Sequence, residues 1–200
     1  MPVATPPPGR RERNKRAKLE RITAAAGELF AAHGVDEVTT QQIADAADIG
    51  TGTLFLYAKT KGELLLLVQN AHYATALERG RAAAATETTA LGAVLALLEP
   101  VVACNRVQVD NGRTYLREMV FGDPTEPHHA DALATVAQTE EAIAGILARH
   151  LRVDEARAAT LARVVSAIVF LTMASSEHLD SDVDRIVDAV RAQVAAILPR

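Results

Sequence analysis

The sequence contains one cysteine, no tryptophan and few aromatic residues, which make up 4% of its 200 residues. With Cys104 alone, an intrachain disulfide and every zinc site that needs several cysteines are excluded, and this cysteine usage suits a reducing cytosol. Glycine and proline number only 11 and 8, while 49% of the residues are apolar. This composition argues against fibrous repeats and wholesale disorder, and a chain of this length buries a core without disulfides or metal.

The sequence also lacks long apolar runs. Its longest uncharged stretch within a strongly apolar segment, Val164 to Ser176, is shorter than the roughly 18 to 20 residues that a membrane-spanning helix requires. The N-terminus, MPVATPPPGRRERNKR, places prolines before its charges and has no apolar core, so it does not fit a secretory signal. We therefore expect a cytoplasmic protein with no membrane partner.

Lysine is missing from most of the chain, because none follows Lys61. The net charge of −4 argues on its own against nucleic acid as a partner. Its distribution argues otherwise, since residues 1–62 hold nine Lys or Arg against seven Asp or Glu, whereas residues 63–200 hold twelve against eighteen. Residues 10–21 alone hold seven basic residues and two acidic ones. Such asymmetry predicts a charged partner for the N-terminal part.

A basic arm and a helix are predicted at the start of the chain. Residues 1–13 are expected to form a disordered arm, because PPPG cannot enter a helix and the arginines have nothing apolar to bury. From about Asn14 the apolar residues recur at three- and four-residue spacing, which predicts a helix that ends at Gly34. The residues that share one face of this helix are Leu19, Ile22, Ala26, Leu29, Phe30 and His33.

Two short helices are predicted next. Thr39 or Thr40 is a suitable N-cap for the first helix, and Thr51 is expected to cap the second. The three residues from Asp48 to Gly50 separate the two helices, since they cannot comfortably extend the first. Thr60 is a candidate cap for the helix that follows.

This pair of helices meets the physical requirements of a helix-turn-helix. Ala44 falls where the two helices cross, a place with room only for a small side chain. The turn needs a residue in the left-handed region of backbone space, usually glycine, and Asp48 is among the few other residues that reach it at modest cost. The positions that pack the pair are occupied by Ile43, Ala47, Ile49, Leu54 and Tyr57.

The remainder of the chain is predicted to be helical, because no alternating run is long enough to indicate a sheet. The fold class is therefore all-α, with about nine helices. The helices expected after the short pair cover residues 64–79, 89–108 with a candidate kink at Pro100, 112–121, 130–151, 154–176 and 181–198. The last two carry wide apolar stripes, which favour a subunit interface through these segments; the alternative is that both pack within one chain.

In a helix-turn-helix the second helix enters the major groove of DNA. Its small side chains let the backbone approach the bases, Gln41 is long enough to reach a base edge, and hydroxyls and cations contact phosphates. The arginines before the first helix are expected along the phosphate backbone or in an adjacent minor groove. The candidate DNA-binding residues are Arg10, Arg11, Arg13, Thr39, Thr40, Gln41, Thr51, Gly52, Thr53, Phe55, Tyr57 and Lys61, with Lys59 near the same outer side.

At these residues the chain resembles the TetR family of transcriptional regulators. The resemblance rests on ITAAAGELFAAHGVDEVTTQQIADAADIGTGTLFLYAKTKGELL, residues 22–65, in which F-x-x-H-G, V-T-T, I-A-x-A-A, T-L-F-x-Y and K-x-E-L-L occur in register. It implies a homodimer with a DNA-binding head, and a helical ligand domain whose last two long helices dimerise. Beyond Leu65 the resemblance is only architectural.

The domain boundaries expected on this basis follow the helix-turn-helix. The DNA-binding domain covers residues 14–62, with the helix-turn-helix at about 40–58, and the effector-binding and dimerisation domain covers residues 63–200. Three residues depart from the pattern of the family: Asp48 where glycine is usual, Phe55 where tyrosine is common, and Ala58 where an aromatic residue often packs.

No catalytic motif emerges after the head. Glu126 to His129 forms one E-x-x-H, but di-iron bundles need this spacing twice with two further glutamates, and the adjacent His128 and His129 lack a clear third ligand. We therefore expect neither an enzyme nor a bound metal or cofactor, and instead an apolar effector cavity between helices. Its candidate residues, each also explained by packing or a surface ion pair, are His72, Tyr73, Asn105, Arg113, Tyr115, Arg117, Met119, Phe170 and Met173.

Two functions follow from the sequence. The leading hypothesis is a homodimeric, ligand-responsive transcriptional regulator, a repressor, that binds a roughly palindromic double-stranded DNA operator and responds to an unidentified small molecule. The alternative is a helical small-molecule-binding protein whose head no longer has a DNA role, an interpretation that Asp48 and Phe55 keep open.

Overall fold

The computed structural model describes residues 9–199. Within these residues the chain forms nine α-helices and one short 3-10 helix and no strand, so the predicted all-α class is confirmed. The expectation of disorder for residues 1–8 lies outside the described residues. The elements in chain order are α1 (Arg10–His33), α2 (Thr40–Ala46), α3 (Thr51–Leu54), α4 (Lys61–Ala84), α5 (Ala90–Arg106), α6 (Val109–Phe121), α7 (Pro127–Leu151), α8 (Glu155–Ala174), the 3-10 helix η1 (Ser176–His178) and α9 (Val183–Ile197).

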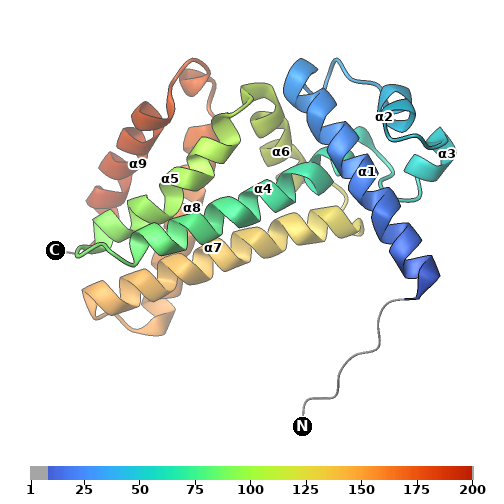
Figure 1. Ribbon diagram of the computed structural model, residues 1–200. Coiled ribbons are helices and arrows are strands. Elements are labelled where there is room, and N and C mark those ends of the chain that lie inside the picture. The colour runs from blue at the N-terminus through green and yellow to red at the C-terminus, as the bar shows by residue number, and fades with distance from the viewer. Residues whose placement is uncertain (1–8, 200) are drawn as a thin grey trace, which may run out of the picture.

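The helices form a small head and a larger body (Figure 1). In the head, α1 packs on the first part of α4, while α2 and α3 lie to one side of α1. In the body, α4 packs against α5 and α7, and α9 lies against α5 and α8. One cluster of buried apolar residues continues through both parts, from Phe30 and Leu54 in the head to Leu65, Leu147 and Ile186 in the body.

Helix α1 begins earlier than the sequence predicted. The arm was expected to end at residue 13, but the helix starts at Arg10 after an extended Gly9. Arg10, Arg11 and Arg13 are therefore helical and lie on a projecting end of α1. The helix tolerates these arginines because its first turns are exposed, so the charged side chains remain in water without a core to bury.

The end of α1 is fastened to the body by a single buried amide. Gly34 has a φ of 78° and ends the helix, as predicted. Asn111 of α6 donates from Nδ2 to the Phe30 carbonyl at 2.8 Å and accepts at Oδ1 from the Val35 N–H at 2.7 Å. The amide thus gives the Val35 N–H its partner and adds a second donor to the Phe30 carbonyl, which also accepts from the Gly34 N–H at 2.9 Å.

The caps of the short helices differ in one place from the prediction. Thr51 is the first residue of α3, and the N-cap is Gly50, which has no side chain to accept a hydrogen bond. The helix is also shorter than the expected two turns, because it ends at Leu54. The predicted cap at Thr60 is confirmed, since its side chain accepts from the Glu63 N–H at 3.0 Å.

Helices α4 and α5 touch backbone to backbone. A Cβ added at Gly80 would lie 2.1 Å from the Leu97 carbonyl oxygen, which no side chain tolerates. Gly80 therefore permits a close approach of these two body helices that any other residue would prevent. Pro100 lies within α5, which continues as one helix through it.

The apolar stripes of the last two helices, α8 and α9, are buried within the chain to different extents. Ile186, Val190 and Val194 of α9 are buried within the chain, against α5 and α8. On α8, by contrast, Val164 and Leu171 remain 41% and 66% exposed. The stripe of α9 therefore gives no argument for a subunit interface, because one chain already covers it, whereas the outer face of α8 does give one.

One helix, α8, is long and apolar enough to cross a membrane by length and composition, and a third of its most apolar window is buried. The uncharged run considered in the sequence missed it because Arg157 and Arg163 interrupt the run while the mean hydropathy stays high. Helices α5 and α6 meet the same criterion only as a pair bent by 110°.

Candidate nucleic-acid interface

Helix α2 begins with a complete capping box. The Thr39 hydroxyl accepts a hydrogen bond from the Gln42 N–H at 3.2 Å, and the Gln42 side-chain oxygen accepts from the Thr39 N–H at 2.8 Å. Thr39 is therefore the N-cap and Thr40 is the first helical residue. The same hydroxyl lies 2.9 Å from Gln42 Oε1 as a donor, so its hydrogen bonds are used within the cap.

The turn between α2 and α3 adopts the predicted backbone geometry. Asp48 has a φ of 51°, in the left-handed region. Arg21 of α1 stabilises this residue, because its guanidinium lies 3.3 Å from Asp48 Oδ2 and donates to the Asp48 carbonyl at 3.5 Å. Ala44 is fully buried at the helix crossing, and its carbonyl accepts from the Ile49 N–H at 3.0 Å. The aspartate is thus accommodated by its own geometry and by a partner on another helix.

A side-chain bridge joins α2 to α3. The Thr51 hydroxyl donates to Gln41 Oε1 at 2.7 Å, and Gln41 Nε2 donates to Asp45 Oδ1 at 2.7 Å. Gln41, predicted as a base-reading residue, therefore uses both ends of its amide to hold the start of α3. It lies on the exposed side of the pair, next to the helix that would enter the major groove.

The recognition segment, residues 51–56, comprises α3 and the two residues after it. Its outer side carries exposed apolar side chains. Gly52 is exposed and Thr53 half-buried, as expected for a backbone that approaches DNA. Phe55 is 44% exposed and Leu56 is 83% exposed, so neither side chain serves the core. Leu56 was not among the predicted residues. Apolar side chains in this position can contact thymine methyl groups in the major groove.

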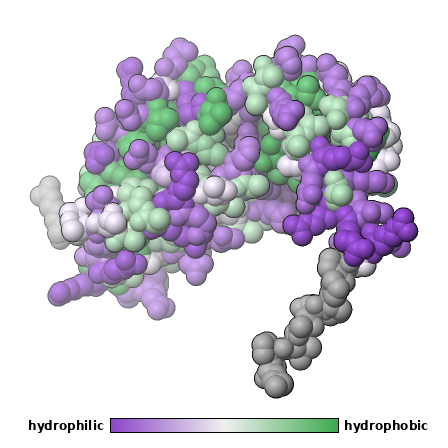
Figure 2. All heavy atoms as spheres, in the orientation of Figure 1, coloured by the Kyte–Doolittle hydropathy of each residue, from purple (hydrophilic) through white to green (hydrophobic). Residues whose placement is uncertain are grey.

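A basic groove separates the N-terminal half of α1 from α3. It has a volume of about 970 Å³. Hydrophilic side chains gather over this end of the head (Figure 2). Four cations and one carboxylate lie along the groove, an electrostatic character that suits a phosphate backbone. The lining residues are Arg10, Arg11, Glu12, Asn14, Lys15, Lys18, Thr53, Leu56 and Tyr57.

Lys15 and Lys18 are groove residues that the sequence reasoning missed. They were counted in the basic run of residues 10–21 but were not assigned to DNA. The helical start of α1 explains the omission, because it places residues three to four apart on one side facing α3. Arg13 and Thr40, which were predicted, lie on α1 and in the first turn of α2 and do not line the groove.

The polar residues after α3 are engaged within the protein. The Tyr57 hydroxyl donates to the Lys15 carbonyl at 3.4 Å, and Lys61 Nζ donates to the Asp36 carbonyl at 3.0 Å. Lys59 forms an ion pair with Glu126 at the start of α7, and this hydrogen-bonded partner raises the pKa of Lys59. Tyr57 reaches the groove, whereas Lys59 and Lys61 tie the end of the head to neighbouring segments.

The body contains a small apolar cavity between α4, α5, α6, α7 and α8. Its volume is about 70 Å³. Of the predicted effector-binding residues, Tyr73, Tyr115, Met119, Phe170 and Met173 line it. The other lining residues are Leu98, Val101, Leu116, Ala132, Thr135, Val136, Thr139, Ser166 and Val169.

Two stacked tyrosines supply the polar groups beside this cavity. The rings of Tyr73 and Tyr115 lie 4.4 Å apart between centroids, at 16° to one another. Tyr73 accepts at its hydroxyl from Asn105 Nδ2 at 2.7 Å, and Tyr115 donates to Asn70 Oδ1 at 2.9 Å. Burial raises the pKa of both phenols, so both are neutral near pH 7. Within residues 9–199, Asn105 Oδ1 has no hydrogen-bond partner.

The remaining predicted effector residues lie outside the cavity. His72 is exposed on α4, 3.3 Å from Gln69 Oε1. Arg113 donates to the Ala174 carbonyl at 2.8 Å and so holds the end of α8, while Arg117 is exposed beside Glu118. Asn105 is buried next to Tyr73 but does not line the cavity. His72 lines a separate groove of about 410 Å³, and Arg113 and Arg117 line another of about 390 Å³, so these residues stay candidates for effector contact.

The other titratable groups singled out in the sequence are dispersed. In the part of the chain that the structure describes, no group of three or more His, Cys, Asp or Glu is arranged to hold a metal ion. Cys104 is half-buried, and burial raises its pKa to about 11. His128 and His129 point to different surroundings, since the ring of His128 bonds the Tyr57 carbonyl and His129 is buried.

Comparison with known proteins identifies the head. Residues 22–68 match the model of "Bacterial regulatory proteins, tetR family". No curated protein sequence matches the chain. The family resemblance seen in the helix-turn-helix residues is therefore confirmed over residues 22–68, which include α2 and α3.

Solved structures share the fold of the whole chain. FadR from Thermus thermophilus, described as a TetR family transcriptional repressor in complex with lauroyl-CoA, is 23% identical and aligns over 91% of this chain and 96% of its own, with a TM-score of 0.72. A TetR transcriptional regulator from Rhodococcus sp. RHA1 is 15% identical over 92% and 96%, with the same TM-score of 0.72. The fatty acid degradation regulator FadR from Bacillus halodurans is 15% identical over 99% and 100%, with a TM-score of 0.63.

Proposed function

We propose that this chain, whose residues 22–68 carry the tetR-family signature on a fold shared with regulators of that family, is a cytoplasmic, ligand-responsive transcriptional repressor. It acts as a homodimer on a roughly palindromic operator, and it is not an enzyme. The observation that carries the proposal is the basic groove between α1 and α3, which lies directly beside the exposed side of the recognition segment.

The DNA contacts divide into positioning and reading residues. Arg10, Arg11, Lys15 and Lys18 line the groove and neutralise phosphates of the backbone that runs along it. Thr53, with the exposed Phe55 and Leu56, faces base edges in the major groove, as do Gly52 and Gln41 at its rim. Thr39, Thr40, Thr51, Arg13, Tyr57 and Lys61 complete the proposed interface through hydroxyls, cations and the backbone N–H groups near the start of α2.

The proposed dimer uses the outer face of α8 together with the exposed side of α9, since the apolar stripe of α9 is already covered within the chain. Val164, Ala167 and Leu171 are exposed at three- and four-residue spacing, so they form one apolar strip on α8. Two copies of this strip related by a two-fold axis would cover each other, as an isologous interface requires. The same axis gives two heads, which matches a palindromic operator with half-sites about one DNA turn apart.

The effector is proposed to be an apolar small molecule that enters the cavity beside Tyr73 and Tyr115. The cavity of about 70 Å³ is well below the roughly 300 Å³ typical of ligand pockets, so binding requires the surrounding helices to move. That requirement links binding to a rotation of α4, which begins directly after the head. Lauroyl-CoA, with which the Thermus thermophilus FadR was solved, provides a first candidate, because its lauroyl chain is apolar although its coenzyme A part is charged.

The DNA role is tested by measuring affinity for the intergenic DNA upstream of the protein's own gene, by gel shift and by fluorescence anisotropy at several salt concentrations. Lys15→Ala combined with Lys18→Ala removes four lysines from the proposed dimer, so it should weaken binding to all sequences and reduce the salt slope by about four, roughly one for each phosphate that is no longer neutralised. Arg149→Ala, an exposed cation at the distal end of α7, is the matched control and should leave the slope unchanged. A folded dimer that binds no DNA at low salt would favour the small-molecule-binding alternative.

A further inference from the structure

We propose that the first turn of α7 transmits the state of the effector cavity to the DNA-binding head, through a chain of hydrogen bonds from Tyr115 to Asn70, His128 and Tyr57. The inference rests on the proposed function, since it assigns the residues that couple its two sites. Asn70 and His128 are then positioning residues. They touch neither the cavity nor the basic groove, but join the residues that do.

The chain of hydrogen bonds starts at the cavity wall. Tyr115 lines the cavity and stacks on Tyr73, and its hydroxyl donates to Asn70 Oδ1 at 2.9 Å. The other end of the same amide, Asn70 Nδ2, donates to the His128 carbonyl at 2.9 Å. The amide has only one productive orientation, because rotation by 180° would turn its oxygen toward the His128 carbonyl oxygen. A displaced Tyr115 ring therefore disturbs both bonds together.

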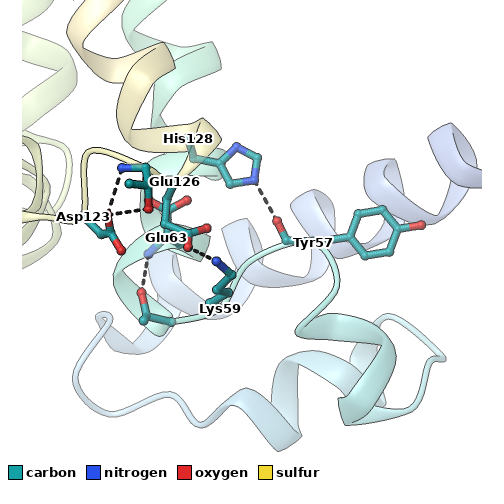
Figure 3. A network of polar contacts seen from close by, with 8 residues as sticks. Tyr57, Lys59, Glu63, Asp123, Glu126 and His128 are labelled. Atoms are coloured by element: carbon teal, nitrogen blue, oxygen red, sulfur yellow. Dashed lines mark hydrogen bonds and ion pairs between the residues drawn. The ribbon is translucent and has the colours of Figure 1, made fainter.

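The chain continues into the head through the imidazole of His128 (Figure 3). His128 Nε2 lies 2.9 Å from the Tyr57 carbonyl oxygen. Since a carbonyl only accepts, the proton of the ring is on Nε2 and the ring donates. Tyr57 is the last residue of the chain of hydrogen bonds, and its side chain lines the basic groove and bonds the Lys15 carbonyl. The four residues thus join the cavity wall to the surface proposed to face DNA.

A second link supports the same turn of α7. Glu126, directly before α7, pairs with Lys59, two residues after Tyr57. The Glu126 side chain is only 9% exposed, whereas that of Lys59 is 70% exposed. The buried carboxylate depends on this lysine, because no other cation among residues 9–199 forms an ion pair with it. Residues 57–59 are therefore held at two points by residues 126–128.

Several buried polar atoms near the first turn of α7 lack hydrogen bonds within the described residues. Glu63 Oε2 and both ring nitrogens of His129 are buried without hydrogen-bond partners among residues 9–199. Glu63 lies beside Glu126 and His128 in Figure 3, and its burial raises its pKa. Unpaired buried polar groups oppose the observed arrangement, so a second arrangement of the same turn lies closer in energy than in a fully satisfied core. Such an element can be shifted by a small change in the cavity.

Hydrogen–deuterium exchange at residues 55–62 tests the chain of hydrogen bonds in the free protein, without DNA or effector. Tyr115→Phe removes only the first bond, and Asn70→Asp keeps an acceptor for Tyr115 but cannot donate to the His128 carbonyl. Each should speed exchange at residues 55–62 by about two- to tenfold, as expected for the removal of one hydrogen bond. Thr75→Val is the control, since its exposed hydroxyl on α4 donates to the Ala71 carbonyl of its own helix, and it should leave exchange in this segment unchanged.

The last link is tested by a pair of variants at His128. His128→Phe keeps the ring shape but removes the donor, whereas the amide of His128→Gln can still donate to the Tyr57 carbonyl. We expect faster exchange at residues 55–62 in His128→Phe and near wild-type exchange in His128→Gln. Adding Tyr115→Phe to His128→Phe should then have little further effect, because the chain is already broken.

Two outcomes overturn the inference: exchange at residues 55–62 that responds to Tyr115→Phe no more than to Thr75→Val, or full additivity in the double variant. Operator binding by the wild-type protein, measured in parallel, separates this result from failure of the proposed function. Coupled exchange without any DNA binding would support the coupling through hydrogen bonds but contradict the proposed regulatory function. DNA binding without coupled exchange would support the proposed regulatory function but contradict the proposed coupling through hydrogen bonds.

Discussion

The head, residues 10–60, and the body, residues 61–199, share one apolar core but differ in how their backbones are fixed. In the head a few polar contacts fix the backbone: the Thr39 capping box, Arg21 on Asp48 and the bridge from Gln41 to Thr51. The body instead packs long helices through apolar side chains, around a cavity of about 70 Å³. Under the proposed function, DNA recognition would depend on this local backbone chemistry, whereas effector recognition would depend on the space left between helices.

The largest expected effect comes from the few buried side chains of the head. Leu54 is fully buried in α3, while Leu56, two residues later, is 83% exposed. Leu54→Ala should lower the free energy of unfolding by about 3 kcal/mol, as for other leucines removed from a core. Leu56→Ala is the matched control and should change it by less than about 0.5 kcal/mol. Urea denaturation measures both, and equal decreases would contradict the distinction between core and interface.

A smaller effect is expected at the cap of α2. Thr39→Ala removes the acceptor for the Gln42 N–H and should destabilise the head by about 1 kcal/mol. Thr40→Ala, in the first turn of the same helix, keeps the capping box and should cost much less. Amide exchange in α2 is the direct measurement. If both variants exchange alike, the capping box does not hold this helix.

The boundary between the two regions should show a dependence on pH. Burial raises the pKa of Glu63 above its ordinary value of 4.5, so the native protein keeps this proton to a higher pH than the unfolded chain. Stability is therefore lost as the pH rises from about 4.5 through the native pKa. Glu63→Gln should remove this decrease and raise Tm at pH 7, and the exposed Glu28→Gln should not. If the Tm of the wild-type protein and that of Glu63→Gln change with the same slope from pH 4 to 8, Glu63 is not the group responsible.

The smallest expected effect is at the turn of the helix-turn-helix. Asp48→Gly relieves the left-handed backbone but removes the exposed ion pair with Arg21, so the unfolding free energy should change by less than about 0.5 kcal/mol. Asp48→Ala keeps the strain and also removes the ion pair, and should cost about 1 kcal/mol. Chemical denaturation distinguishes them. A large gain in Asp48→Gly would show that the aspartate does weaken the turn.

The head was largely predictable because its structure depends on residues close in sequence. The cap at Thr39, the left-handed Asp48 and the cap at Thr60 each follow from side chains within three residues of the backbone groups they serve. Where the prediction was wrong, the reason was also local: Gly50 is extended enough to be the N-cap of α3 without a side-chain acceptor, so Thr51 begins the helix.

The body was predictable in outline, and its sites less so. The helices fell within a few residues of their expected bounds, because apolar periodicity specifies them. The pattern does not specify which apolar face meets which helix, so the coverage of α9 within the chain was missed. Hydrogen bonds such as that of Asn70 with His128 join residues 58 positions apart, and no local signal marks them. Their identification requires the packed structure.

The backbone contact at Gly80 sets how the head can move. Because α4 and α5 touch there without intervening side chains, this point of α4 can neither slide along α5 nor move closer to it without steric overlap. The helix extends roughly 28 Å from Gly80 to its first residue, at about 1.5 Å per residue. It therefore acts as a lever with its fulcrum in the body, and a tilt of about 5° would carry the head about 2.5 Å over that length. If effector binding rotates α4, as proposed, small adjustments around the tyrosine pair would therefore be magnified at the end of α4 that adjoins the head.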